Sequence, residues 1–140
     1  MMADHFEEIY APKLASKSVL APNGACILWT GTQKKCRAMY YGVMCCRVPP
    51  DQAWKTLYVH RMALIFDRHW SLDDIDQPGM HASHLCHNPL CVKPLHIEYE
   101  PQHVNLNRIN CVNRGTCQKH GEYRDCMLLL KKPIGGDGGT

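Results

Sequence analysis

Cysteine and histidine occur in the middle of this chain at the short, regular intervals that metal-binding loops need. Cys86, Cys91 and His96 follow one another at intervals of five residues, and a proline stiffens each interval. Thiolate and imidazole groups are preferred ligands of Zn²⁺, which takes four of them in a closed tetrahedral site. The spacing therefore predicts a zinc-binding loop that needs a fourth ligand from elsewhere in the chain.

Cys26 is the expected fourth ligand of this first zinc site. It opens a short apolar strand, residues 26–30, which follows the turn signal Asn23-Gly24. A strand packed beside the loop would supply the thiolate and tie the two halves of the chain together. A buried cysteine without a metal is the alternative for this position.

A second cluster follows, with intervals of six, three and six residues between its members, Cys111, Cys117, His120 and Cys126. Four ligands make a closed Cys₃His site, which is typically structural rather than catalytic. Nine cysteines could instead form disulfides, but the count is odd and nine histidines are interleaved with them. Two structural Zn²⁺ ions are the more economical interpretation.

Length and composition predict one thinly packed domain. The chain has 140 residues, is 45% hydrophobic and contains two Phe, ten Gly and nine Pro, so bound metal is expected to contribute folding energy. It has no run of eighteen apolar residues, and its N-terminus lacks the basic-then-apolar pattern of a secretion signal. These features predict an intracellular protein without a membrane segment.

The hydrophobic patterns predict an α+β fold in which a small antiparallel sheet precedes the metal site. Residues 4–20 are expected to start as a helix that ends near Pro12 or continues as irregular chain. Residues 32–35 form a polar turn, 37–48 and 55–59 are extended, and Gly42 marks a bulge or a close backbone approach. A helix at 60–68 then packs on the sheet, and an acidic connecting loop follows at 71–78.

The central stretch then predicts the order strand, zinc loop, strand, helix. His84 ends the first strand, residues 96–100 form the second, and the helix that carries Asn105 begins at Pro101. As a single domain the chain divides into an N-terminal helix or arm, a sheet with its helix, this core, the second zinc site and a partly disordered tail, at 1–25, 26–79, 80–110, 111–126 and 127–140. The three remaining cysteines are expected to serve in packing, at Cys36, Cys45 and Cys46.

Positive charge is concentrated in the predicted sheet, although the formal net charge is only +3. Between Cys26 and Arg61 six basic residues stand against the single acid Asp51, and a twisted basic sheet of this kind can lie in a DNA groove. The alternative is an ordinary solvated strand face. Besides Arg61, the candidate DNA-binding residues are Lys34, Lys35, Arg37, Arg47 and Lys55.

The stretch SHLCHNPLCVKPLHIE, followed by Asn105, resembles the motif of the His-Cys box homing endonucleases and of the related phage-type HNH endonucleases. Both belong to the His-Me finger, or ββα-metal, nuclease superfamily. Upstream, CILWTG, YYG and VHR resemble elements that these families place before the motif, so the likeness covers roughly residues 26–126. The second Cys/His cluster is similar to the extra zinc site of the His-Cys box group.

The resemblance implies a ββα-metal motif and a Mg²⁺-dependent endonuclease acting on double-stranded DNA. It makes His84 the general base, Asn105 the protein ligand of one catalytic Mg²⁺ and Arg61 a contact to the scissile phosphate. A neutral imidazole can take a proton from water near pH 7, and Mg²⁺ favours oxygen ligands, so the residue types suit these roles. The resemblance also implies a homodimer and a nuclear location, although only fourteen residues follow Cys126, fewer than the tail through which that group dimerises.

Two other functions remain open at this stage. A double-zinc module without catalysis could bind nucleic acid or protein, and loss of His84 or Asn105 would have suggested it. An RNA nuclease of the same superfamily is the other, because such a site contacts phosphates rather than sugars. Arg61 could also be a surface arginine without a role, and His81, His87 and His103 are expected to be bystanders.

Overall fold

The computed structural model describes residues 2–127, with side chains from residue 5 onward. Helix α1 (Met2–Ser16) leads into a two-stranded sheet of β1 (Ser18–Leu20) and β2 (Ile27–Trp29). A three-stranded antiparallel sheet follows, formed by β3 (Gln33–Cys36), β4 (Met39–Val48) and β5 (Ala53–Tyr58). The mixed α+β architecture is as predicted.

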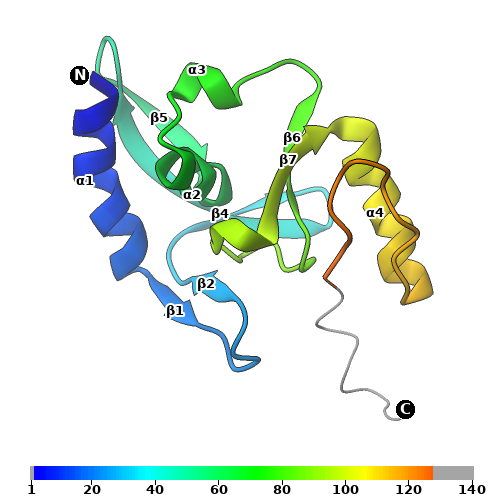
Figure 1. Cartoon of the computed structure of the whole chain (residues 1–140). Helices are drawn as coiled ribbons and strands as arrows, with labels where there is room; N and C mark the ends of the chain where they lie inside the picture. Colours follow the sequence, from blue (N-terminus) through cyan, green and yellow to red (C-terminus); the bar gives the residue numbers. More distant parts are fainter. Residues whose placement is uncertain (1, 128–140) are drawn as a thin grey trace.

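The central part of the chain has the predicted ββα order. After α2 (Val59–Arg68) and the short α3 (Leu72–Ile75), strand β6 (Met80–His84) pairs antiparallel with β7 (Ile97–Pro101). The 3₁₀ turn η1 (Pro94–His96) precedes β7, and α4 (Gln102–Arg114) follows it. In Figure 1 the segment after α4 folds back along that helix. Of the predicted tail, only Met127 lies inside the described residues.

Helix α1 extends beyond Pro12, near which the sequence predicted that it could end. Its buried side chains, Phe6, Tyr10 and Leu14, recur every four residues and therefore form one apolar stripe. That stripe packs into the main core with α2 and β4. Tertiary packing of this stripe outweighs the loss of one hydrogen bond at the proline, so the helix continues.

Two segments expected to be irregular are regular. Residues 33–36 pair with β4 as strand β3, although all four side chains are exposed and show no hydrophobic alternation. Within the expected acidic loop, Ser71 begins α3 with a capping box, because Asp74 N–H donates to Ser71 Oγ and Ser71 N–H donates to Asp74 Oδ2. Asp74 is therefore the partner of the N-cap residue Ser71 in this capping box.

Two cores hold the fold together. The larger one collects α1, α2 and the inner side of the sheet around Trp29, Met62 and Leu64. Gly42 lies against Trp29, where an added Cβ would come within 2.4 Å of the indole ring. The prediction of a close backbone approach at Gly42 is confirmed. The smaller core consists of Ala21 and three of the predicted zinc ligands, so apolar residues alone do not build it.

Candidate functional site: two Cys₃His clusters and a ββα motif

The four ligands predicted for the first zinc site converge in the structure. Cys26, Cys86, Cys91 and His96 each offer a ligand atom, and these four atoms lie within 4.8 Å of one another. All four residues are buried, with exposed fractions of 3% or less. Strand β2 delivers Cys26 by hydrogen bonds to the loop, from Trp29 N–H to the Leu90 carbonyl and from Val92 N–H to the Ile27 carbonyl.

The distances within this cluster fit a tetrahedral zinc ion. His96 Nδ1 lies 3.5 Å from both Cys26 Sγ and Cys91 Sγ. In a tetrahedral site with Zn–S bonds of about 2.3 Å and Zn–N bonds of about 2.0 Å, sulfur and nitrogen are about 3.5 Å apart. Burial raises the pKa of the Cys26 thiol, so a cation is needed for all three sulfurs to be thiolates.

The second predicted cluster also converges. The ligand atoms of Cys111, Cys117, His120 and Cys126 meet the same limit of 4.8 Å, and His120 Nε2 lies 3.4 Å from the sulfurs of Cys111 and Cys126. Backbone N–H groups donate to the sulfurs, from Gln118 to Cys111 and from Cys126 to Cys117. Such donors stabilise thiolates, so this cluster fits a second zinc ion.

His84 lies at the end of β6, where its imidazole is held by the zinc loop. Its Nε2 lies 2.9 Å from the backbone carbonyl oxygen of Cys91, a ligand of the first cluster. A carbonyl oxygen only accepts, so Nε2 carries the proton and Nδ1 keeps the lone pair of the neutral ring. Burial lowers the pKa of His84 to about 4, which keeps the imidazole neutral near pH 7.

An aromatic cluster connects His84 with the three-stranded sheet. The ring centroids of His60 and His84 are 4.5 Å apart. The ring of Tyr41 on β4 stacks on His84 at 6.2 Å and is tilted against His60 at 5.7 Å. Tyr58, the last residue of β5, lies 5.8 Å from His60. The face of the sheet that carries Tyr41 and Tyr58 is therefore continuous with the imidazole of His84.

Asn105 lies on α4 beside β6. It contacts Ser83, the residue before His84, and so lies on the opposite side of the strand from the His84 side chain. Its Oδ1 accepts a hydrogen bond from Ser83 Oγ at 2.8 Å, and its Nδ2 lies 3.1 Å from His81 Nδ1. Neighbouring side chains leave a strand on opposite sides, so Ser83 points to Asn105 and His84 to Cys91 and His60. The amide and the imidazole thus flank the end of β6 without touching each other directly.

His81 contacts the side-chain amide of Asn105 directly. It was expected to be a bystander, but its Nδ1 accepts from the amide of Asn105 while Ser83 donates to the amide oxygen. Together the two contacts fix which end of the amide carries oxygen. The available signal was the alternation along β6, which puts residues 81 and 83 on one face.

Arg61 lies one residue after His60, at the start of α2. Its Nη2 donates to the carbonyl oxygen of Ile75 at 3.1 Å and lies 3.8 Å from the Asp76 carboxylate, whose side chain is 84% exposed. An ion pair this exposed contributes little stability. The guanidinium is thus positioned by its hydrogen bond to the end of α3, and its ion pair with Asp76 is weak.

The register divides the predicted basic residues between the two faces of the sheet. Directly paired residues share a face, so Lys34 and Arg47 lie with their partners Tyr41 and Trp54. This is the outer face, which continues to His60 and His84. The guanidinium of Arg47 lies over the indole of Trp54 at 5.5 Å, and Trp54 is 63% exposed.

The remaining basic residues are placed differently. Lys55 pairs with the buried Cys46, and Lys35 pairs with Tyr40. Both lysines therefore lie on the inner face of the sheet, whose central part packs against the larger core. Arg37 occupies the turn between β3 and β4 with a φ of 58°. The same register exposes Cys45 on the outer face, and Cys36 is exposed as well. The expectation that these two cysteines serve in packing was wrong, whereas Cys46 is buried as expected.

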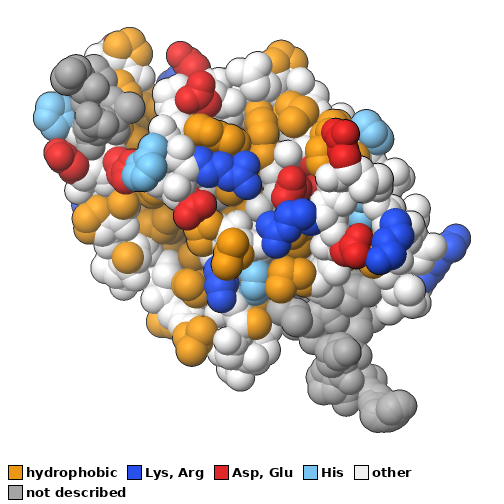
Figure 2. Space-filling model, viewed as in Figure 1, with side chains coloured by type: hydrophobic (Ala, Val, Ile, Leu, Met, Phe, Trp, Pro, Cys, Tyr) orange, Lys and Arg blue, Asp and Glu red, His pale blue; other side chains and the backbone are white. Residues whose placement is uncertain are grey.

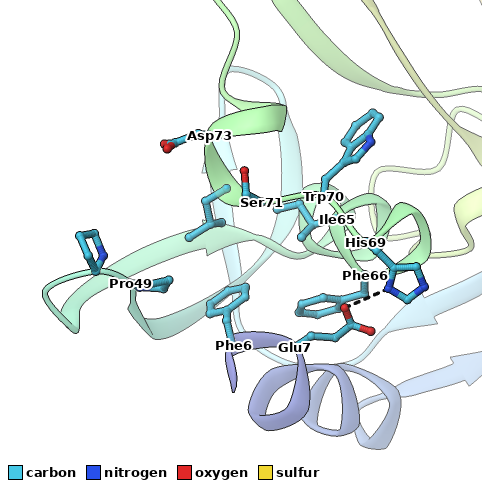
Figure 3. Close-up of a pocket in the computed structure, with 11 residues that line it drawn as sticks. Phe6, Glu7, Pro49, Ile65, Phe66, His69, Trp70, Ser71 and Asp73 are labelled. Atoms are coloured by element: carbon cyan, nitrogen blue, oxygen red, sulfur yellow. Dashed lines mark hydrogen bonds and ion pairs between the residues drawn. The ribbon is translucent and has the colours of Figure 1, made fainter. Parts of the chain in front are cut away.

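Other surfaces carry less of the predicted chemistry. On the face shown in Figure 2, Lys and Arg side chains are interspersed with acidic ones rather than gathered in one patch. A cavity of about 330 Å³ lies between α1, the end of α2, α3 and the β4–β5 turn, with Phe6, Phe66 and Trp70 in its wall (Figure 3). The pair of His69 and Glu7 at 3.3 Å lies there too. None of the predicted site residues lines this cavity.

Comparison with known proteins agrees with the geometry. Residues 25–133 match a family model described as the zinc-binding loop region of homing endonuclease. No curated protein and no solved structure matches the chain. Among residues 2–127, no helix has both the length and the apolar character to cross a membrane. The match covers both Cys₃His clusters and the ββα motif, and the chain therefore belongs to this homing-endonuclease family, in line with its resemblance to the His-Cys box group.

Proposed function

We propose that this protein is a Mg²⁺-dependent endonuclease that hydrolyses phosphodiester bonds in double-stranded DNA. The observation that carries the proposal is the hydrogen bond from His84 Nε2 to the Cys91 carbonyl. It leaves Nδ1 of a neutral ring as the basic atom, and it fixes the ring through the backbone of a zinc ligand. A general base needs this combination of tautomer, orientation and protonation state.

In the proposed reaction, His84 Nδ1 accepts a proton from a water molecule as the water oxygen attacks the phosphorus atom. The bond between phosphorus and the 3′ oxygen then breaks, and the departing oxygen receives a proton from solvent. Arg61 would contact the scissile phosphate, since the nucleic acid can replace the weakly held carboxylate of Asp76. Positioning and charge neutralisation are the main contributions a protein makes to this chemistry.

Asn105 is the residue proposed to hold the catalytic Mg²⁺. Its amide oxygen is a hard ligand of the kind that Mg²⁺ prefers, and Ser83 and His81 determine where that oxygen points. When bound, Mg²⁺ would supply positive charge to the phosphate oxygens and the leaving 3′ oxygen. The two zinc sites lack an open position, so their proposed role is to hold the loop that carries His84 and the helix that carries Asn105.

Double-stranded DNA is favoured as the substrate by the outer face of the sheet. The major groove admits a two-stranded β-ribbon, and β4 pairs with β3 along residues 39–42 and with β5 along residues 43–48. Lys34 and Arg47 on the outer face could then contact phosphates beside the groove. The Tyr41 cluster connects this face with His84, so DNA bound there would reach the proposed base.

Cleavage assays on zinc-loaded protein test the proposal. Plasmid DNA and a structured RNA would each be incubated with Mg²⁺ and without added divalent cation, leaving the zinc in place. The proposal predicts nicked or linear plasmid only when Mg²⁺ is present. RNA cleavage alone would point to an RNA nuclease, and tight DNA binding without cleavage would point to a non-catalytic module; either result would overturn the proposal.

A further inference from the structure

Helix α4 carries three functional side chains on one face. Asn105, Arg108 and Cys111 follow one another at intervals of three residues, so they form a row along the helix. Asn105 is the proposed Mg²⁺ ligand, Cys111 is a ligand of the second Cys₃His cluster, and Arg108 lies between them. A displacement of either end of this row would move the other.

Apolar packing by itself gives α4 few attachments. Only Val104, Arg108 and Cys111 are buried among its thirteen residues, whereas Leu106 and Ile109 are exposed by 43% and 54%. Of these three, Val104 is an aliphatic residue, Arg108 is a cation and Cys111 belongs to the second Cys₃His cluster. The position of α4 on the β6–β7 hairpin therefore depends on what Arg108 and Cys111 contact.

Arg108 attaches α4 to β7 through a two-pronged ion pair. Its Nε and Nη2 donate to the two carboxylate oxygens of Glu100, both at 2.7 Å. The exposed fractions of the two side chains are 2% and 0%. Hydrogen bonds of this bidentate, charge-assisted kind are directional as well as strong, so they fix the rotation of α4 about its axis.

The same guanidinium contacts the second zinc cluster. Arg108 Nη1 donates to Cys126 Sγ at 3.3 Å, and Nη2 also donates to the carbonyl oxygen of Arg124 at 2.8 Å. Three thiolates and one imidazole around Zn²⁺ leave a net negative charge, and Glu100 carries a second one. Arg108 thus lies between two anionic groups and is hydrogen-bonded to both.

We propose that Arg108 is a positioning residue that couples occupancy of the second zinc site to the orientation of the Asn105 amide. The inference rests on the proposed function, because it concerns the residue that would hold Mg²⁺. With zinc bound, Cys126 and Glu100 hold the guanidinium from two sides, and α4 presents Asn105 to Ser83 and His81. Without zinc, the contact with Cys126 weakens and the row from Cys111 to Asn105 loses one anchor.

The test uses a charge-free replacement of the ion pair, Arg108→Met with Glu100→Leu. Removing Arg108 alone would leave a buried carboxylate unpaired and could unfold the protein, whereas apolar replacement of both partners is often tolerated. Arg114→Met, at an exposed position of the same helix, is the matched control. Zinc release to a chromophoric chelator then reports on each site separately from any cleavage activity.

The proposal predicts that one of the two zinc ions leaves the double variant at least about tenfold faster than it leaves the parent, with release of the other unchanged. In ¹⁵N spectra the side-chain NH₂ signal of Asn105 should shift in the double variant. Cys117→Ser, which removes a second-site ligand that Arg108 does not touch, should shift the same signal in the parent. Adding Cys117→Ser to the double variant should shift the Asn105 signal no further, because the Cys117 substitution and the loss of the ion pair would break the same coupling.

Equal acceleration of both zinc ions would show general destabilisation and overturn the proposal. An unchanged Asn105 signal in the double variant would overturn it too. For a parent that cleaves DNA, the Mg²⁺ concentration for half-maximal rate should rise about tenfold in the double variant. A parent that cleaves nothing would refute the proposed function alone, because zinc release and the Asn105 signal still decide the coupling.

Discussion

The imidazole of His84 is hydrogen-bonded to the backbone of a residue in the first Cys₃His cluster, with Nε2 at 2.9 Å from the carbonyl oxygen of Cys91. Cys91 is itself completely buried, and its sulfur lies within 4.8 Å of the ligand atoms of the other three members of the cluster. Zinc binding and the geometry of the proposed active site are therefore linked through one residue. Loss of zinc from this cluster would therefore free the proposed base and destabilise the fold.

Zinc removal is the first prediction. Because the smaller core consists mainly of ligands, a strong chelator should unfold the chain, and the loaded protein should contain two zinc ions by mass spectrometry under native conditions. Cys86→Ala should bind one zinc ion fewer and melt at a lower temperature. Cys36→Ala, at an exposed position, should keep both ions. A cooperative melt that is indifferent to the chelator would contradict both sites.

Gly42 tests the packing beneath the sheet. A Cβ at this position would come within 2.4 Å of the Trp29 ring and 2.7 Å of Val59. Gly42→Ala should therefore destabilise the fold by about 2 kcal/mol, as overpacking in a core does. Denaturant unfolding followed by tryptophan fluorescence measures it, with Cys45→Ala on the exposed face of the same strand as control. Equal stability of the two variants would show that Trp29 moves aside freely.

The two faces of the sheet should differ in DNA binding. Lys34→Ala with Arg47→Ala removes two charges from the outer face, and Lys35→Ala with Lys55→Ala removes two from the other face. Each lost phosphate contact lowers the slope of log affinity against log salt by about 0.9. Titrations at several salt concentrations should show a loss of about 1.8 for the first pair and a much smaller change for the second. Identical slopes for the two pairs would mean that the face does not matter.

His81 should set the Mg²⁺ requirement of cleavage. Its Nδ1 accepts from the Asn105 amide, so His81→Ala frees the amide to rotate and to present nitrogen instead of oxygen. The Mg²⁺ concentration for half-maximal cleavage should rise about tenfold, as for other residues that orient a metal ligand. His81→Gln, which keeps an acceptor, should recover part of the loss, and His103→Ala, at an exposed position of α4, should have no effect. A uniform loss of rate at all Mg²⁺ concentrations would argue against this role.

The sequence predicted the ββα order and the convergence of both Cys₃His clusters, and most of the residues involved are related by local spacing. Zinc needs four ligands, and Cys86, Cys91 and His96 supply three of them from one loop. Only the fourth, Cys26, had to be inferred from a distant part of the chain. Strand β3 was missed because its four residues are exposed and polar, so pairing with β4 alone makes it a strand. Helix α1 passes Pro12 for a similar reason, since its packing depends on elements that follow later in the chain.

Side-chain relationships between elements were the hardest to predict. Glu100 and Arg108 form a buried ion pair, yet the sequence marks neither as buried, because charged residues are normally exposed. Alternation along β3 separates Lys34 from Lys35, but which of the two lies on the outer face depends on the register of β3 against β4, and spacing along one strand does not supply it. His81 became visible as a partner of Asn105 only when α4 was placed against β6.

The most direct test of the account is DNA cleavage by His84→Ala and His84→Gln, measured on protein whose zinc content and melting temperature match the parent. Gln keeps an N–H that can reach the Cys91 carbonyl, so it separates the loss of the base from the loss of that contact. Both variants should bind two zinc ions and cleave plasmid about 10²- to 10⁴-fold more slowly, the usual cost of losing a general base. Cleavage at the parental rate by either folded variant would contradict the account.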